Sequence, residues 1–214
     1  MKRETLRKIT IFLIKLLSRP EYSGLEHLPK EGPVIVATNH MSRVDTMLLF
    51  INPVRKDITA LVADKYLDYP FFRFILKTGG VIFLDRSQAD FGAFRKAREV
   101  LKEGVALGIA PEGTRSDTGQ LQEGKPGTAM LAATTQTPVV PVGIAGTDTY
   151  FRDILRLRRP RVQVCFGPAM HLPPLDRGKR DEQLNQYTED IMLAIARLLP
   201  ERHHGFYKHH PRLR

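Results

Sequence analysis

A histidine and an aspartate with four residues between them, His40 and Asp45, follow an apolar run at residues 33–37. Histidine titrates nearest to neutral pH, and a carboxylate on one ring nitrogen fixes the tautomer and leaves the other nitrogen free as a base. The pair is therefore equipped to take a proton from an alcohol. On spacing alone, a histidine that only caps the end of a strand is the alternative interpretation.

A second polar pair, Asp85 and Arg86, follows the apolar run at residues 81–84. An Asp-Arg pair at a strand end could satisfy itself as an ion pair. Alternatively, the guanidinium of Arg86 could bind an anion. The residues themselves leave both interpretations open.

A turn rich in hydrogen-bond donors follows residues 105–110. Its sequence at residues 111–116 is Pro-Glu-Gly-Thr-Arg-Ser, in which Pro and Gly favour a tight turn with accessible backbone N–H groups. Donors that converge in this way, together with a forked guanidinium, suit a phosphate. Lys125, at the opening of a helical run, could face the same pocket. The alternative is an ordinary turn that leads into the polar loop at residues 117–123.

Alternating strand-like and helical runs must position these residues. The apolar runs are short and nearly unbroken, as expected of strands covered on both faces: residues 33–37, 58–63, 81–84, 105–110, 139–144 and 162–166. The helical patterns are residues 44–50, 70–77, 90–102, 128–135 and 181–199. This order predicts a single α/β domain with a central, mostly parallel or mixed sheet flanked by helices, and function in the loops beyond the strand ends.

Residues 1–19 predict an amphipathic helix ahead of that domain. One broad face gathers Leu6, Ile9, Phe12, Leu13, Leu16 and Leu17. The opposite face gathers Glu4, Arg7, Lys8, Lys15 and Ser18, with Ile11 among them. Six basic residues are present, namely Lys2, Arg3, Arg7, Lys8, Lys15 and Arg19. This pattern favours a helix lying in a membrane interface, and packing on the domain's own core is the alternative.

The organisation predicted along the chain is therefore threefold. Residues 1–22 form the N-terminal membrane-interface helix, which Pro20 ends, and residues 23–200 form the α/β domain. Residues 201–214 form a basic, His-rich tail. The tail's histidines suggest a metal site, but no acids accompany them nearby, so we expect a mobile basic tail and no metal.

The composition indicates a globular protein with excess positive charge. Of 214 residues, 42% are hydrophobic and 26% are charged, which is ordinary for one domain with a sizeable core. Thirty-three Lys and Arg against 23 Asp and Glu give a net charge of +10. This charge favours an anionic partner, whether a phosphorylated substrate, a membrane surface or a nucleic acid.

Part of that charge is a cluster of arginines: Arg152, Arg156, Arg158, Arg159 and Arg161. The sequence leaves their role open among a membrane surface, the phosphates of a substrate, and solvent. Cys165 is the only cysteine, which excludes an intramolecular disulfide and a cysteine-built metal cluster and makes a reducing cytoplasmic setting the default. No run reaches the roughly 20 apolar residues that span a bilayer.

Four segments occur in order along the chain: NHMSRVD at 39–45, GVIFLDR at 80–86, APEGTRS at 110–116 and VVPVGIAG at 139–146. They resemble the motif blocks of the glycerolipid acyltransferase family, specifically of its 1-acylglycerol-3-phosphate O-acyltransferases. GKPG at residues 124–127 also fits, and the resemblance covers about residues 33–146. Ala110 stands where the family generally has an aromatic or larger apolar residue, a departure that removes no chemical group.

The resemblance implies transfer of a fatty acyl group from acyl-CoA or acyl carrier protein to the free hydroxyl of 1-acylglycerol 3-phosphate, giving phosphatidic acid. By position in the matching blocks, His40 would be the general base and Asp45 its orienting partner. The residues that would hold the acceptor's phosphate are Arg86, Glu112, Gly113, Thr114 and Arg115, and Lys125 would assist the phosphate or the developing oxyanion. No metal or cofactor is implied.

Two questions of mechanism and location follow from this resemblance. Ser42 could be an acylated nucleophile, but we favour direct transfer with Ser42 as a local hydrogen-bonding residue. A lipid substrate predicts a peripheral or monotopic protein on the cytoplasmic face of a membrane, bound to anionic phospholipid.

Three rival functions remain. A family member could use another acceptor, such as glycerol 3-phosphate or a lyso-ornithine lipid. A non-catalytic lipid-binding protein could keep the same surface. A nucleic-acid-binding module is suggested by charge alone, and the sequence carries no nucleic-acid-reading motif, so we expect no nucleic-acid partner.

Overall fold

The computed structural model describes residues 1–63, 67–84 and 91–213. Its strands are β1 (Arg19–Ser23), β2 (Val34–Thr38), β3 (Thr59–Ala63), β4 (Ile82–Leu84), β5 (Ala106–Ile109), β6 (Val139–Ala145) and β7 (Arg161–Phe166). Its α-helices are α1 (Arg3–Leu17), α2 (Arg43–Phe50), α3 (Pro70–Gly79), α4 (Phe91–Lys102), α5 (Gly127–Thr135), α6 (Tyr150–Leu155) and α7 (Arg180–Arg197). Short 3₁₀ helices include η1 (Leu25–His27), η3 (Glu201–His203), η4 (Gly205–Tyr207) and η5 (Pro211–Leu213).

The strands form one mixed sheet in the order β1-β7-β6-β2-β5-β3-β4. From β6 to β4 every neighbouring pair is parallel. β7 runs antiparallel to β6, and β1 pairs parallel with β7 at the edge. The predicted α/β domain with a mostly parallel or mixed sheet is therefore confirmed.

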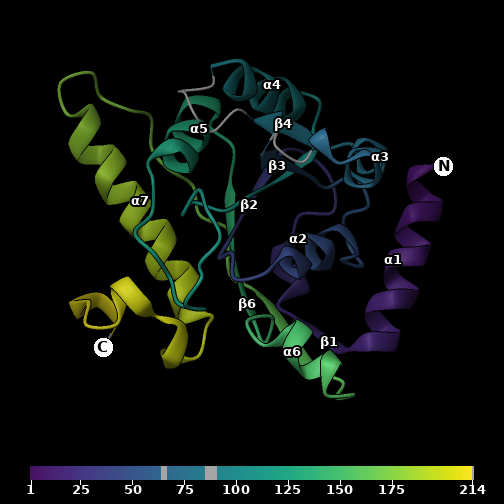
Figure 1. The fold of residues 1–214 in the computed structure, drawn as a ribbon. Coiled ribbons are helices and arrows are strands. Elements are labelled where there is room, and N and C mark those ends of the chain that lie inside the picture. The colour runs from purple at the N-terminus through teal and green to yellow at the C-terminus, as the bar shows by residue number, and fades with distance from the viewer. Residues whose placement is uncertain (64–66, 85–90, 214) are drawn as a thin grey trace.

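Helices cover both faces of this sheet (Figure 1). In β2, Ile35 and Ala37 join the core cluster that includes residues of α4, α5 and α7. Val34 and Val36 join the opposite cluster, with residues of α1, α2 and α6. All four side chains are fully buried, which is why the strand shows an unbroken apolar run and no alternation.

Two elements escaped the sequence patterns. Residues 19–23, which the sequence indicated as a break, form the edge strand β1, where a proline is tolerated because an edge strand leaves some N–H groups unpaired. Residues 150–155 form the short helix α6 within what the sequence showed only as an arginine-rich connection.

The C-terminal segment, expected as a mobile tail, is folded against the domain in the structure. Residues 201–213 form η3, η4 and η5, and His203 and Tyr207 are buried. Nδ1 of His203 lies 2.6 Å from the carbonyl oxygen of Gly119, and the N–H of Leu121 donates to the carbonyl of His203 at 2.8 Å. The Tyr207 hydroxyl accepts from the N–H of Gly124 at 3.0 Å. The segment therefore holds the loop at residues 119–124.

Helix α1 presents two different faces. Leu6 and Ile14 are buried against the domain, and Ile11 packs partly against the same core. Arg3 and Arg7, expected among the cations that face lipid, instead donate to backbone carbonyls, Arg3 at residues 57 and 58 and Arg7 at residues 50 and 52. The interpretation of a helix packed on its own domain is confirmed for this face.

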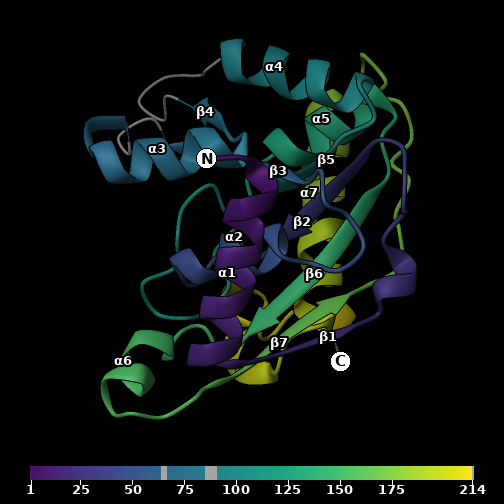
Figure 2. The same cartoon turned by 90° about the vertical axis from the view of Figure 1, so that its right-hand side faces the viewer.

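The other face of α1 is apolar and open to solvent. Its exposed side chains are Ile9, Phe12, Leu13, Leu16 and Leu17. Within the described residues, the structure contains no helix whose length and hydropathy would allow it to cross a bilayer. The helix runs along the outside of the domain from the α3 end of the sheet toward β1 (Figure 2).

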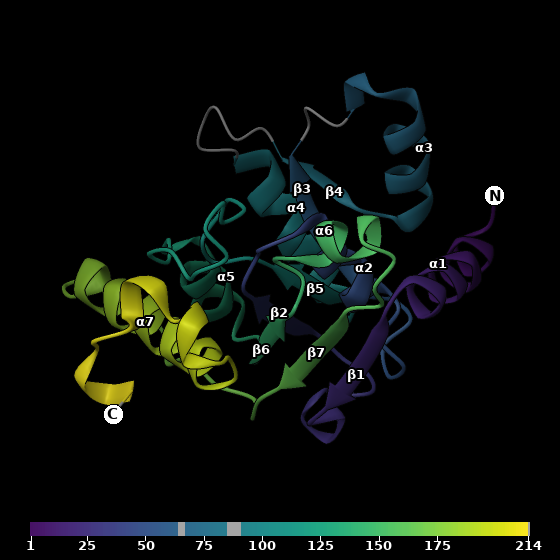
Figure 3. The same ribbon diagram turned by 60° about the horizontal axis from the view of Figure 1, so that its bottom comes forward.

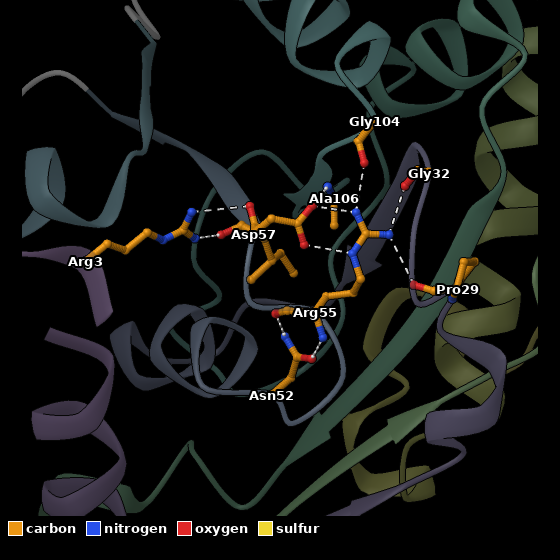
Figure 4. A network of polar contacts seen from close by, with 9 residues as sticks. Arg3, Pro29, Gly32, Asn52, Arg55, Asp57, Gly104 and Ala106 are labelled. Atoms are coloured by element: carbon orange, nitrogen blue, oxygen red, sulfur yellow. Dashed lines mark hydrogen bonds and ion pairs between the residues drawn. The ribbon is translucent and has the colours of Figure 1, made fainter. Parts of the chain in front are cut away.

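A buried arginine fastens the end of the sheet at which the parallel strands begin. Arg55 is 2% exposed and uses all five N–H donors: two on the Asp57 carboxylate at 2.8 and 2.6 Å, and three on carbonyls of Pro29, Gly32 and Gly104. Its hydrogen bonds lower the pKa of the Asp57 carboxyl. Figure 4 shows Asp57 between Arg55 and Arg3, so this network also ties α1 to the sheet.

Candidate active site

The candidate site lies at the carboxyl ends of the parallel strands β2, β5 and β6. His40 follows β2 by two residues and precedes α2, and the turn at residues 111–116 follows β5. Because β5 and β6 flank β2 in the sheet, the segments that follow these strands meet at one edge. The Arg55 network lies at the other end of these strands, where they begin.

Asp45 holds the ring of His40. Its Oδ2 lies 3.1 Å from His40 Nδ1 and also accepts the backbone N–H groups of Met41 and Ser42, each at 2.7 Å. Asp45 is 1% exposed, whereas the His40 side chain is 21% exposed. A carboxylate on Nδ1 favours the tautomer that carries its proton there, so Nε2 is left with a lone pair.

Ser42 has a structural role at the start of α2. It is the N-cap residue, and its Oγ accepts the N–H of Val44 at 3.4 Å, while the Asp45 carboxylate accepts the N–H of Ser42 itself. This is a capping box, in which two otherwise unpaired N–H groups are satisfied reciprocally. Ser42 is also buried, as a local hydrogen-bonding residue would be.

Glu112 connects the turn after β5 to His40. One carboxylate oxygen accepts the N–H of His40 at 3.0 Å, and the other accepts the N–H of Gln122 at 2.9 Å. Burial raises the pKa of Glu112 to about 7, opposed by the hydrogen bonds from these two N–H groups. Glu112 is 2% exposed. The sequence predicted that its side chain contacts the acceptor, whereas in the structure it binds the backbone of His40 and Gln122.

The remaining residues of the turn lie around His40. The N–H of Ser116 donates to the carbonyl of His40 at 2.8 Å. The backbone of the turn at Arg115 and Ser116 is therefore close to that of His40. Arg115 is partly exposed, and its guanidinium lies 3.8 Å from the exposed Asp117 carboxylate. Thr114 is exposed. The guanidinium of Arg115 therefore lies partly exposed on the turn whose backbone is hydrogen-bonded to His40.

Gly113 and Lys125 fit together. Gly113 has φ of +71°, and a Cβ there would lie 3.1 Å from Lys125 Cδ and 3.4 Å from its Nζ. The N–H of Lys125 donates to the carbonyl of Pro111 at 2.8 Å. The lysine side chain therefore crosses the glycine of the turn, and a side chain at position 113 would displace it as well as strain the backbone.

Asn39 is a site residue that the sequence patterns missed. Its fully buried amide donates to the carbonyl of Ile144 at 2.8 Å and accepts the N–H of Ile144 at 2.8 Å. This pair clamps the end of β2 to β6 immediately before His40. Its position next to His40 in the first motif was the available signal, but its partner lies 105 residues away.

Two further observations complete the site. A hollow of about 250 Å³ beside the His40 turn is lined by polar residues that include Ser116, Thr149 and Arg152. Asp85 and Arg86 lie outside the described residues. The structure thus brings together His40, Asp45, Glu112, Gly113, Arg115 and Lys125, with Thr114 on the same turn.

Comparisons with known proteins point to one family. The Acyltransferase family model matches residues 19–145. A 1-acyl-sn-glycerol-3-phosphate acyltransferase of Borreliella burgdorferi is 34% identical over 193 residues, which cover 88% of this chain and 75% of the relative. A protein of the same name from Pseudomonas aeruginosa is 31% identical over 198 residues, covering 88% and 76%.

A solved structure also matches. The crystal structure of PlsC, the 1-acyl-sn-glycerophosphate (LPA) acyltransferase of Thermotoga maritima, aligns with a TM-score of 0.69 at 26% identity, covering 88% of this chain and 76% of that one. The fold and the site define an α/β protein with a carboxylate-bound histidine at the carboxyl ends of parallel strands. The chain belongs to the Acyltransferase family, so the family resemblance of its four motif segments is confirmed.

Proposed function

We propose that the protein transfers a fatty acyl group from an acyl thioester, acyl-CoA or acyl carrier protein, to the free hydroxyl of 1-acylglycerol 3-phosphate. The product is phosphatidic acid. The observation that carries the proposal is the His40–Asp45 pair, which has a buried carboxylate and a partly exposed ring. The backbone carbonyl of His40 accepts the N–H of Ser116, which follows Arg115 in the turn. The names of the relatives support the choice of acceptor.

The proton transfer follows from the tautomer that Asp45 favours. Nε2 of His40 takes the proton of the acceptor hydroxyl as its oxygen forms a bond to the thioester carbonyl carbon. The tetrahedral intermediate then breaks its carbon–sulfur bond, and the imidazolium returns the proton to the departing sulfur. General base action contributes typically 10²–10⁴-fold, and juxtaposition of the two substrates contributes more. Because a thioester is already activated, the step calls for no metal or cofactor.

The phosphate of the acceptor needs cations near His40. Arg115 and Lys125 supply them from the turn and from the loop that crosses it. Arg86 is assigned to the same role on its motif position alone. Glu112 keeps the turn against His40, a role supported by the hydrogen bonds that its carboxylate accepts from the N–H groups of His40 and Gln122.

The substrate's location supports the membrane part of the proposal. Lysophosphatidate and phosphatidate reside in bilayers, and α1 exposes an apolar face that nothing in the described chain covers. We assign the protein to the cytoplasmic face of a membrane, held peripherally or monotopically by anionic phospholipid.

One experiment tests the activity and the acceptor together. Purified protein is incubated with radiolabelled acyl-CoA or acyl carrier protein and 1-acylglycerol 3-phosphate, glycerol 3-phosphate or lyso-ornithine lipid, with His40→Ala as the matched control. We expect labelled phosphatidic acid from the first acceptor only. A labelled product from another acceptor would identify that acceptor as the substrate in place of 1-acylglycerol 3-phosphate. Vesicle binding without thiol release from any donor would identify a non-catalytic lipid-binding protein.

A further inference from the structure

Helix α6 and the segment that follows it up to the start of β7, residues 151–161 and named here the α6 connection, expose large apolar side chains. Phe151 is 57% exposed, Leu155 is 85% exposed and Leu157 is 96% exposed. Single exposed apolar residues are ordinary on protein surfaces, but three within seven consecutive residues form a patch. Nothing in the described chain covers this patch.

Leu157 is also unusual in its backbone conformation. Its φ is +56°, in the left-handed region, directly after the C-cap of α6, and its N–H donates to the carbonyl of Ile154. Helices commonly place glycine at this position because a side chain is disfavoured there. A leucine that is strained and almost fully exposed contributes nothing visible to the fold, which points to a contact outside the chain.

Arginines alternate with these apolar residues. The exposed guanidinium side chains of the connection are Arg156, Arg158, Arg159 and Arg161. Among the described residues none of the four forms an ion pair, and the nearby Asp153 accepts the hydroxyl of Thr149 at 2.6 Å. Interleaved apolar and cationic groups match an anionic lipid surface, in which hydrocarbon lies next to phosphate.

The connection is joined to the exposed face of α1. The guanidinium of Arg159 donates to the carbonyls of Lys15 and Ser18 at the C-terminal end of that helix. Figures 2 and 3 both show α6 and the following turn beside this end of α1. The α6 connection is therefore held beside the C-terminal end of α1.

The same surface adjoins the candidate active site. Helix α6 follows β6 directly, at the sheet edge where His40 lies, and Figure 2 shows the arrowhead of β6 directed toward α6 and the end of α1. Arg152 of α6 lines the hollow beside the His40 turn. A bilayer that touches the α6 connection would therefore lie at the entrance to that hollow.

We propose that residues 151–161 are a second membrane-contact element, which binds an anionic phospholipid surface beside α1 and turns the His40 edge of the sheet toward the bilayer. The proposal deepens the proposed function, on which it rests for the identity of the lipid acceptor. It assigns Arg156, Arg158 and Arg161 to lipid phosphate and assigns Phe151, Leu155 and Leu157 to the acyl-chain boundary.

The first test is vesicle cosedimentation of the full chain with vesicles of phosphatidylglycerol and phosphatidylcholine. The variant Leu155→Ser/Leu157→Gly removes two apolar contacts, and glycine at position 157 fits its left-handed backbone, so folding is preserved. We expect partitioning to weaken by about tenfold or more. Phe91→Ser is the matched control, because Phe91 is 82% exposed on α4, away from this surface.

Charge reversal completes this test. Arg156→Glu/Arg158→Glu should weaken binding to vesicles that contain phosphatidylglycerol and leave the weaker binding to pure phosphatidylcholine unchanged. Partitioning of the leucine variant equal to that of the wild type would overturn the proposal. An unchanged partition of the arginine variant with a raised KM for acyl-CoA would overturn it in favour of contact with the phosphates of coenzyme A.

A second measurement does not depend on loss of binding. The sequence contains no tryptophan, so Leu155→Trp introduces a single reporter. Its emission should shift to the blue and be quenched by brominated lipids when vesicles are added, whereas Phe91→Trp should not respond. An unresponsive Leu155→Trp protein that still cosediments would show that another surface binds the membrane.

The membrane-contact proposal can fail or succeed independently of the proposed acyltransferase activity. Activity of the leucine variant on detergent-dispersed substrates should match the wild type, because the His40 site is untouched. A protein that is inactive on all acceptors but shows the expected vesicle results would retain the membrane element and lose only the assigned reaction.

Discussion

The backbone N–H of His40 donates to the carboxylate of Glu112, which lies 72 residues further along the chain. The second carboxylate oxygen accepts the N–H of Gln122. One buried side chain therefore sets the position of the histidine and of the loop that follows the cationic turn. Glu112 acts on the site through geometry, and its chemistry can be tested separately from that of His40.

Glu112→Gln should change how stability depends on pH. Burial raises the pKa of Glu112 from 4.5 to about 7. A pKa that is higher in the folded state favours folding at low pH, and this contribution is lost as pH rises from about 4.5 through 7. The free energy of unfolding of the wild type should therefore fall, relative to that of the variant, by at most about 3 kcal/mol over this range. Urea unfolding at pH 4.5 to 8 measures it, and parallel curves for the two proteins would contradict the assigned burial.

Asp45→Asn should reduce kcat strongly while the fold persists. The asparagine oxygen can take the place of Oδ2, where it still accepts the N–H groups of Met41 and Ser42 and faces Nδ1 of His40. The neutral amide lacks the charge that stabilises the imidazolium formed when Nε2 takes the proton, so a loss of about 10²-fold or more is expected. Steady-state kinetics and thermal unfolding measure both effects. His40→Ala is the reference, and an Asp45→Asn protein with wild-type kcat would remove Asp45 from the role of partner to His40.

Ser42→Ala should cost stability and little activity. Loss of the N-cap hydroxyl of α2 is worth about 1 kcal/mol, and direct transfer requires no serine. Chemical denaturation and kinetics with saturating substrates measure these two quantities. If Ser42→Ala is as inactive as His40→Ala, and mass spectrometry of the wild type detects an acyl-serine, the covalent route replaces direct transfer.

Asn39→Ala should destabilise the protein by about 2–4 kcal/mol, because it leaves both backbone groups of buried Ile144 without partners. Asn39→Asp is the informative companion, since its carboxylate can accept the N–H of Ile144 but repels the carbonyl. We expect both variants to lose activity as well, in proportion to the freedom gained by the His40 segment. A variant that is as stable as the wild type would show that the clamp to β6 is dispensable.

Arg55→Lys should separate stability from catalysis. A lysine offers three donors where the arginine makes five hydrogen bonds, and the loss should destabilise folding by about 2–4 kcal/mol. The network lies at the opposite sheet edge from His40, so kcat at a temperature well below unfolding should be unchanged. A lowered kcat with unchanged stability would contradict the assignment of Arg55 to stability alone.

The sequence was sufficient for the elements that carry their own signal. β2, β5 and β6 are buried on both faces and show as unbroken apolar runs, so the placement of His40 at a strand end could be predicted. The relation of His40 to Asp45 followed from spacing, because both lie within one strand-to-helix turn. The turn containing Gly113 was predicted from local residue types.

What escaped prediction depends on partners far away in the chain. Arg3 and Arg7 belong to a helix full of cations, and only the fold shows that they bind carbonyls of the domain. Pro20 indicated a break, yet an edge strand forms there because β7 lies beside it. The histidines of residues 201–214 suggested a mobile tail, whereas His203 fits against Gly119.

That contact with Gly119, together with the Tyr207 hydroxyl on Gly124, has a consequence for biosynthesis. The loop beside the histidine is held by residues translated long after it, so a nascent chain that ends before position 207 carries every motif but not the finished pocket. Catalytic competence should thus arise only once residue 207 has been added and has folded back, after the sheet itself has assembled.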